Sequence, residues 1–269
     1  MKIAILGPKG TFSHETVLNY SKKAKVLFQK TVWDVFDAVE SKKADLGIVP
    51  IENSISGTIG LTLDALMEFD LNIIAEEILP VKHNLVGFCS IKDIKTIYVH
   101  PQTYTQCEKF IRNHLQNADI IQTISNGESA EKLLNKKSRT SAAIVPKIAA
   151  DIYRLKILKK DIQDSKFNIT RFAIISEKKA KRTGHDRTSI TIYPQIDKPG
   201  LLYKLLGEFA KRKVNLSRIE SRPSKGKLGD YIFFIDLQGH RDDKKVKETF
   251  HSIEKNFFLK ILGSYHREY

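Results

Sequence analysis

The sequence predicts an α/β protein in which a first part with two lobes is followed by a smaller second module. Short β-branched strands alternate with helical segments up to about residue 175, an order typical of mainly parallel sheets. One helix–strand unit occurs twice within that part. A polar and charged stretch, residues 176–186, lacks apolar periodicity and separates the first part from a region with a different pattern.

The repeated unit consists of a helix, a basic turn and a buried strand that ends in proline. Its first copy covers residues 34–50 and its second covers residues 128–146. The two copies are too loosely similar to prove duplication, but they indicate two α/β lobes of similar build. Ligands bind beyond the carboxyl ends of parallel strands, so a cleft between the lobes is the expected ligand site.

We place the first lobe at about residues 1–75 plus 168–178 and the second lobe at about 80–165, within a region 1–178. A linker follows at 179–187, and the second module covers 188–269. The candidate passages between the lobes are three apolar segments, residues 73–79, 84–88 and 169–175.

The second module has the order β-α-β-β-α-β, which is the ferredoxin-like arrangement. A turn at Pro199-Gly200 leads into its first helix, and the segment 225–229 connects its second and third strands. Its predicted strands are residues 188–193, 216–221, 231–237 and 259–262, and its predicted helices are 201–209 and 246–257.

Composition restricts the class of protein. The 269 residues are 41% hydrophobic and 28% charged, which is typical of a globular chain. No apolar run is long enough to span a membrane, so we expect no membrane partner. The chain opens with a strand and a turn rather than a signal peptide, which predicts a cytoplasmic location.

The net charge of +14 comes mostly from lysines that are spread along the chain. No helix-turn-helix, zinc-finger spacing or aromatic RNA-binding pattern accompanies them, so we predict no nucleic-acid partner. Such a field attracts small anions instead. Cys89 and Cys107 have no metal-ligand spacing, and no His, Cys, Asp and Glu cluster has one, so we predict no metal.

Two polar turns follow predicted strands of the first lobe. In residues 7–13, glycines permit close backbone approach, and Thr11 can cap the next helix, whose N-terminus favours anions. In residues 49–58, a buried strand ends in Glu52, Asn53 and Ser54. Both turns also fit ordinary strand–helix connections, and only the second is dense enough in polar groups to favour a ligand site.

A third polar junction lies in the second lobe. His100 follows a predicted strand, and Gln106 and Cys107 lie in the first turns of the next helix. His100 could act as a general acid or base because its side chain titrates near neutral pH, although a polar loop residue is an equally simple interpretation. His83 permits the same two interpretations.

Residues 168–172 combine a hydroxyl, a fixed cation and an aromatic face. The segment continues as an apolar strand, in which Thr170 and Phe172 share one face and Arg171 points to the other. Arginine matches a carboxylate in bidentate fashion. These groups suit a ligand that carries both a carboxylate and a ring.

Taken together, these motifs resemble the prephenate dehydratase family, with a catalytic domain followed by an ACT regulatory domain, over essentially the full length. The resemblance implies a two-lobed fold of the periplasmic-binding-protein type, with the active site in the cleft. It also implies conversion of prephenate to phenylpyruvate, water and carbon dioxide without a cofactor. The resemblance is carried by Gly7-Pro8, Gly10-Thr11-Phe12-Ser13, Val49-Pro50-Ile51-Glu52-Asn53-Ser54 with Gly57, His100-Pro101-Gln102 with Gln106-Cys107, Thr170-Arg171-Phe172, Pro199-Gly200 and Glu220-Ser221-Arg222-Pro223.

The resemblance implies two catalytic residues. Thr170 would donate a proton to the leaving hydroxyl or only orient it, and Glu52 would hold the network or shuttle a proton. Arg171 would either clamp a substrate carboxylate or anchor the strand. Phe172 would pack beside the ring. The remaining implied substrate-binding residues are Asn53, Ser54, Thr11, Gln106 and His100.

The resemblance also implies that phenylalanine binds the ACT domain across the interface of a homodimer or homotetramer and inhibits. Two residues depart from the family pattern. Val99 stands where a serine is common, so that hydroxyl is not essential here. Leu201 stands where alanine is common and could reshape the effector pocket. The implied phenylalanine-binding residues are Gly200, Leu201, Leu202, Asn215, Leu216, Glu220 and Ser221.

Two other functions stay open at this point. Arogenate, in which an amine replaces the side-chain keto group of prephenate, would undergo the same chemistry. A two-lobed sensor that binds an amino acid without catalysis would belong to a different class. The hydroxyl of Thr170 together with residues 52–54 favours an enzyme.

Overall fold

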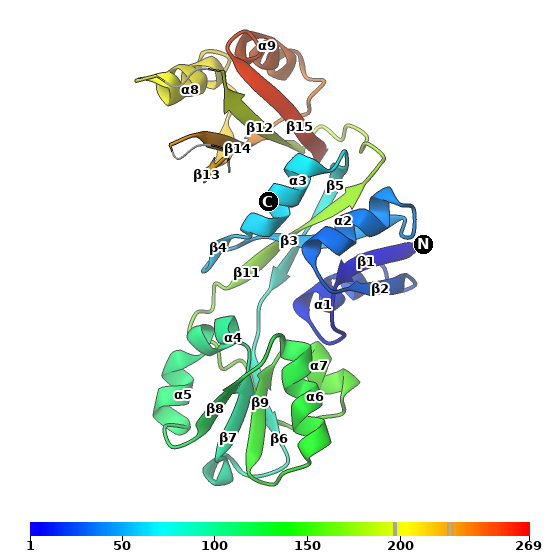
Figure 1. Cartoon of the computed structure of the whole chain (residues 1–269), viewed down its shortest axis with the longest axis vertical. Coiled ribbons are helices and arrows are strands. Elements are labelled where there is room, and N and C mark those ends of the chain that lie inside the picture. Colours follow the sequence, from blue (N-terminus) through cyan, green and yellow to red (C-terminus); the bar gives the residue numbers. More distant parts are fainter. Residues whose placement is uncertain (196–197, 225, 227–228) are drawn as a thin grey trace.

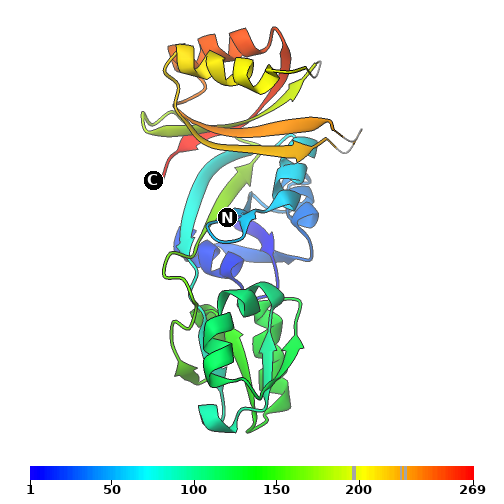
Figure 2. The same ribbon diagram turned by 90° about the vertical axis from the view of Figure 1, so that its left-hand side faces the viewer.

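The structure, a computed structural model, describes residues 1–195, 198–224, 226 and 229–269. Lys225, Lys227 and Leu228 of the expected strand connection lie outside the described residues. Within the described part, the chain forms three sheets that follow one another along the long axis of the molecule (Figures 1 and 2). No helix of that part combines the length and the apolar character needed to cross a bilayer.

The first sheet has the order β2-β1-β3-β11-β5, with the short β4 added to β3. β1 is parallel to β2 and β3, whereas β11 is antiparallel to β3 and β5. The elements of this lobe are β1 (Lys2–Leu6), α1 (Phe12–Tyr20), β2 (Lys25–Gln29), α2 (Val32–Glu40), β3 (Leu46–Asn53), β4 (Gly57–Thr58), α3 (Gly60–Glu68), β5 (Asn72–Pro80) and β11 (Ile169–Ser176).

The second sheet has the order β10-β6-β9-β7-β8. β7 is parallel to β8 and β9, whereas β6 is antiparallel to β9 and β10. Its elements are β6 (Asn84–Gly87), a 3₁₀ turn (Ile91–Asp93), β7 (Thr96–Val99), α4 (Pro101–Gln106), α5 (Glu108–His114), β8 (Asp119–Gln122), α6 (Asn126–Lys136), β9 (Ser141–Val145), α7 (Lys147–Ile152) and β10 (Ile157–Lys159).

The two sheets are built on one plan, which confirms the prediction of two similar lobes. In each, three parallel strands are followed by one antiparallel strand that arrives from the other lobe, β11 in the first and β6 in the second. The repeated unit of the sequence occupies equivalent places, α2 with β3 and α6 with β9. The first lobe extends to Pro80, beyond the expected residue 75, because β5 pairs with β11 along its length.

The expected passages between the lobes were wrong. Residues 73–79 and 169–175 are strands of the first sheet, and residues 84–88 include β6 of the second. They are apolar because they are buried inside sheets. The chain crosses between the lobes in the short segments that join β5 to β6 and β10 to β11 (Figure 1).

The third sheet is fully antiparallel, in the order β13-β14-β12-β15, and α8 and α9 cover one of its faces (Figure 2). This confirms the ferredoxin-like prediction. The second helix ends at Ile253 rather than residue 257, because Phe257 already pairs with Pro194 in the sheet. The elements are β12 (Asp186–Pro194), α8 (Leu201–Lys211), β13 (Leu216–Pro223), β14 (Tyr231–Gln238), α9 (Lys244–Ile253) and β15 (Phe257–His266).

The other face of the third sheet packs directly on the first lobe. Phe234, Leu262 and Tyr265 belong to the same hydrophobic core as the helices of that lobe. Gly263 lies against β5, where a Cβ atom would come within 2.2 Å of the Ile73 carbonyl oxygen. Lys260 Nζ donates to the carbonyl oxygens of residues 66, 67 and 69 at the end of α3. The module therefore shares a core with the first lobe.

A buried ion cluster lies at the centre of this contact. Arg171 of β11, which is 4% exposed, donates to Asp236 of β14 at 2.7 Å and to Glu76 of β5 at 3.3 Å. Arg187 of β12 donates to the same Glu76 oxygen at 3.0 Å. Burial alone would lower the pKa of Arg171, but Asp236, Tyr265 and Glu76 raise it above its ordinary value, so the guanidinium stays charged.

Removing one charge from this cluster should destabilise the whole protein. We expect Asp236→Asn to lower the free energy of unfolding by about 3 kcal/mol, because Arg171 stays buried with one fewer counter-charge. Urea denaturation measures this loss. Glu108→Gln, which removes an exposed ion pair with Arg112, is the matched control and should cost less than about 0.5 kcal/mol. Equal losses in both variants would contradict the importance of the cluster.

Candidate active site

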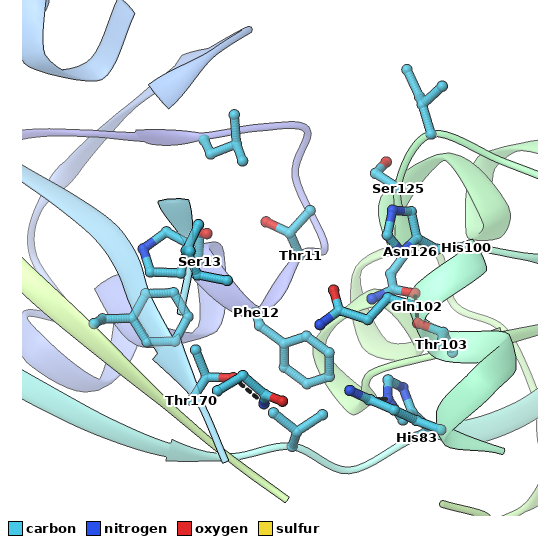
Figure 3. A pocket seen from close by; sticks show the side chains of 18 of the residues that line it. Thr11, Phe12, Ser13, His83, His100, Gln102, Thr103, Ser125, Asn126 and Thr170 are labelled. Carbon is cyan, nitrogen blue, oxygen red and sulfur yellow. Dashed lines mark hydrogen bonds between the residues drawn. The ribbon is translucent and has the colours of Figure 1, made fainter. Parts of the chain in front are cut away.

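A cavity of about 200 Å³ lies between the two lobes (Figure 3). Its first wall comes from the turn after β1, the end of β3 and the start of β11. Its second wall comes from the turn after β7, helix α4 and the start of α6. The lining includes Thr11, Phe12, Asn53, Thr170 and Phe172 from the first lobe, His83 from the crossing between β5 and β6, and His100, Gln106, Ser125 and Asn126 from the second lobe.

Six of the residues expected in a site come together in this cavity: Thr11, Asn53, His100, Gln106, Thr170 and Phe172. They lie far apart in the sequence and on five different elements or turns. Their convergence follows from the shared plan of the two lobes, since each set of turns faces the other across the cleft.

Arg171 lies outside the cavity. Strand alternation directs its side chain to the face of β11 opposite Thr170, where it enters the ion cluster with Asp236 and Glu76. The expectation that it clamps a substrate carboxylate is therefore corrected, and the alternative of a strand anchor fits its position.

Glu52 and Ser54 also lie outside the cavity lining. Glu52 pairs with Arg171 at 3.2 Å, on the face of the sheet that meets the third sheet, so a direct proton shuttle is corrected as well. Ser54 Oγ donates to the Phe167 carbonyl oxygen at 2.8 Å and accepts from the Ile169 N–H at 2.9 Å. Ser54 thus ties the end of β3 to the start of β11 instead of facing a ligand.

A chain of side-chain hydrogen bonds runs across the cavity from one lobe to the other. Asn53 Nδ2 donates to Thr170 Oγ1 at 3.0 Å and to Asn168 Oδ1 at 2.8 Å. Asn168 Nδ2 donates to Gln106 Oε1 at 2.8 Å, and His83 Nε2 lies 2.8 Å from the same oxygen. The chain links β3, β11 and α4, so it depends on the lobes being closed together.

The direction of these bonds determines what Thr170 can do. Asn53 Oδ1 accepts from the N–H groups of Ile55 and Ser56, which fixes the amide with its nitrogen toward Thr170. Because Thr170 Oγ1 accepts from that nitrogen, the hydroxyl hydrogen is left to point elsewhere. Thr170 lines the cavity, so its hydroxyl is available as a donor to a bound molecule (Figure 3).

The cavity attracts anions without a charged side chain. Among the described residues that line it, none is Lys, Arg, Asp or Glu. Burial lowers the pKa of His83 to about 4 and also lowers that of His100, which keeps both rings neutral. The first turns of α1 and α6 open into the cavity through Thr11 and Ser125, their N-caps, and helix N-termini carry partial positive charge.

The lobes touch on both sides of the cavity. A Cβ atom on Gly127 would lie 2.3 Å from the Lys9 carbonyl oxygen, so glycine is required where α6 meets the first lobe. On the other side, Gln102 Nε2 donates to Ser56 Oγ at 2.9 Å. These contacts join the two lobes at the rim of the cavity.

Sequence reasoning missed several residues of the site. Asn168 lies in the segment 168–172 but was given no role, and His83 was left undecided. Ser125 and Asn126 had a usable signal, because Ser125 caps α6 through the Glu128 N–H at 3.0 Å and precedes an acidic residue, a helix-start pattern. No local pattern could have shown that this helix start faces Thr11 across a cleft.

The fold and the cavity define a class: a two-lobed α/β protein with a polar, uncharged cavity between its lobes and a ferredoxin-like third module. The family model for prephenate dehydratase matches residues 3–180, and the model for the ACT domain matches residues 188–255. The chain belongs to the prephenate dehydratase family, with an ACT domain as its third sheet.

Individual relatives agree with this assignment. A prephenate dehydratase of Methanocaldococcus jannaschii is 41% identical, over 96% of this chain and 95% of its own length. A bifunctional chorismate mutase/prephenate dehydratase of Aquifex aeolicus is 40% identical, over 98% of this chain and 73% of its own length. The crystal structure of prephenate dehydratase from Arthrobacter aurescens in complex with L-Phe has a TM-score of 0.91 at 36% identity, covering 99% of this chain and 90% of that one.

The buried ring of His83 should make stability depend on pH. Its pKa falls from an ordinary 6.5 to about 4 in the native protein, so the unfolded state binds more protons between these values. Stability should therefore fall as pH decreases, by about 2 kcal/mol between pH 7 and pH 5 from this residue alone. Urea denaturation at both pH values measures the loss, and His83→Gln should reduce it by that amount. An unchanged pH dependence in the variant would contradict the assignment.

Proposed function

We propose that this chain converts prephenate into phenylpyruvate, water and carbon dioxide, and that phenylalanine inhibits it through the ACT domain. One observation supports this most directly: Thr170, whose hydroxyl accepts from Asn53, lines a cavity between the lobes that suits an anion. Membership of the prephenate dehydratase family supplies the substrate, and the relative crystallised with L-Phe supplies the effector.

In this mechanism the first turns of α1 and α6 receive the carboxylates of prephenate. The bond between the ring and its carboxylate breaks, and the carboxylate leaves as carbon dioxide. The electron pair of that bond forms a ring double bond, and the carbon–oxygen bond to the ring hydroxyl breaks. Thr170 donates a hydrogen bond to the departing oxygen, which leaves as water after gaining a proton that ultimately comes from solvent. Phe172, which is buried against the cavity, provides an apolar wall for the ring.

The cavity favours prephenate over arogenate. Arogenate carries an ammonium group, and the described lining holds no carboxylate to pair with it. Helix N-termini repel a cation as they attract an anion. A sensor without catalysis is the less favoured alternative, because a hydroxyl whose hydrogen is available in the cavity is suited to assist a leaving group.

The direct test measures phenylpyruvate formation from purified protein and prephenate. We expect Thr170→Val to lower kcat by about 10²–10⁴, because the isosteric side chain lacks the donor, whereas Thr170→Ser should lose less than about tenfold. Arogenate should be turned over with a kcat/KM about 10² lower than prephenate. Full activity in Thr170→Val would overturn the proposed mechanism. Absence of product from the wild-type protein would overturn the proposed function.

The effector site remains a prediction, and the structure assigns different environments to its residues. Gly200 caps α8 with φ of 80°, a backbone conformation that glycine tolerates. Leu201 packs in the core of the ACT domain, and the expected effect of its size on an effector pocket stays a prediction. Leu202 and Ser221 are exposed, Leu216 packs against the same core, and Asn215 accepts from the Gln238 N–H at 2.9 Å.

Glu220 lies at the contact with the first lobe. Its carboxylate accepts from Thr58 Oγ1 of the first lobe at 3.1 Å, and Arg218 Nη2 donates to the same hydroxyl at 3.0 Å. Glu220 therefore faces the first lobe, and its expected part in phenylalanine binding stays a prediction. Thr58 pairs with Glu52 in the sheet, next to Asn53. We infer that phenylalanine acts on Thr170 through this bridge from β13 to the end of β3.

Removing the bridge should separate inhibition from catalysis. We expect Thr58→Val to keep kcat/KM for prephenate within about threefold, while the phenylalanine concentration for half-inhibition rises about tenfold. Lys260→Met is the matched control, since it removes ACT-to-lobe hydrogen bonds that do not involve β13. Similar loss of inhibition in both variants would contradict a specific path.

The assembly into a homodimer or homotetramer and the cytoplasmic location both stay predictions.

A further inference from the structure

We infer that His83 is a positioning residue for the reaction, which fixes the side-chain amide of Gln106 so that its nitrogen donates into the cavity. This inference rests on the proposed function, because it assigns a task to a residue that lines the same site. His83 acts through Gln106 and needs no contact with the substrate.

His83 lies in the short crossing between β5 and β6, and its ring is 1% exposed. Contacts to its backbone and to its ring hold it. Its backbone N–H donates to Gln163 Oε1 at 3.0 Å, the Phe12 ring packs edge-on at 5.4 Å, and Nε2 lies 2.8 Å from Gln106 Oε1. An amide oxygen only accepts, so the ring nitrogen that faces it carries the hydrogen.

Gln106 Oε1 accepts from two buried donors at once. His83 comes from one crossing between the lobes, and Asn168 comes from the other. With the oxygen held by both, the amide nitrogen of Gln106 is the remaining donor of that side chain, and Gln106 lines the cavity. Losing one of the two donors would permit the amide to turn over and present its oxygen to an anionic substrate.

The other nitrogen of His83 argues against a purely structural role. Nδ1 is buried and has no hydrogen-bond partner among the described residues. A buried unsatisfied acceptor costs about 1–3 kcal/mol, which an apolar side chain of similar size would avoid. A histidine at this position is expected if the benefit of its Nε2–H donor to the reaction outweighs the stability lost at the unpaired Nδ1.

The test is a double-mutant cycle measured as turnover of prephenate. His83→Met keeps much of the volume and removes the donor, and we expect kcat to fall about 10–10²-fold with KM within about threefold. His83→Gln should retain kcat within about threefold, because a glutamine amide nitrogen can occupy the place of Nε2. In a Gln106→Ala background, His83→Met should change kcat less than about twofold, since the group it positions is absent.

Each outcome decides the inference. If His83→Met lowers kcat equally in both backgrounds, His83 supports the fold and does not position Gln106. Wild-type activity in His83→Met would also overturn the inference. Should His83→Met fail to fold, His83→Asn replaces it, because its shorter amide keeps a polar group yet does not reach Gln106. Absence of turnover in the wild type would instead overturn the proposed function, so the two failures are distinguishable.

Discussion

The insertion of β11 between β3 and β5 is the constraint on which the rest of the molecule depends. This strand returns from the second lobe and closes the first sheet, and its two faces serve different purposes. Thr170 and Phe172 face the cavity, while Arg171 faces the ACT domain. Because side chains alternate along a strand, moving β11 by one residue would exchange these environments and bury a cation in the cavity.

The cavity between the lobes has no charged lining side chain among the described residues, in a protein that has a large excess of positive charge. A cation beside the ring carboxylate would stabilise the group that the reaction removes, and so would favour the ground state. Helix N-termini and amides are weaker, fixed donors, and in the proposed mechanism Thr170 donates to the leaving oxygen, where charge develops. These roles suit a reaction that is driven by formation of an aromatic ring. In such a reaction the protein mainly orients the substrate and stabilises the developing charge.

The ACT domain is a structural part of the catalytic lobe. Its sheet completes the core around α2 and α3, and the buried charges of Arg171, Glu76 and Asp236 link three strands across the contact. A buried ion cluster has strict geometric requirements, since each charge needs its partners in place. A change in β13 can therefore reach the end of β3 through rigid contacts, over a short path that includes Thr58.

The sequence by itself determined the order of the strands and helices, the two similar lobes, the ferredoxin-like module and the family, because these follow from local periodicity and from motifs. It also determined that Thr170 and Phe172 share a face of one strand. Only the tertiary structure decided that Arg171, Glu52 and Glu220 face the contact with the ACT domain, and that His83 and Asn168 hold Gln106. Those contacts join residues distant in the chain, and a polar side chain gives no local sign of which partner will bury it.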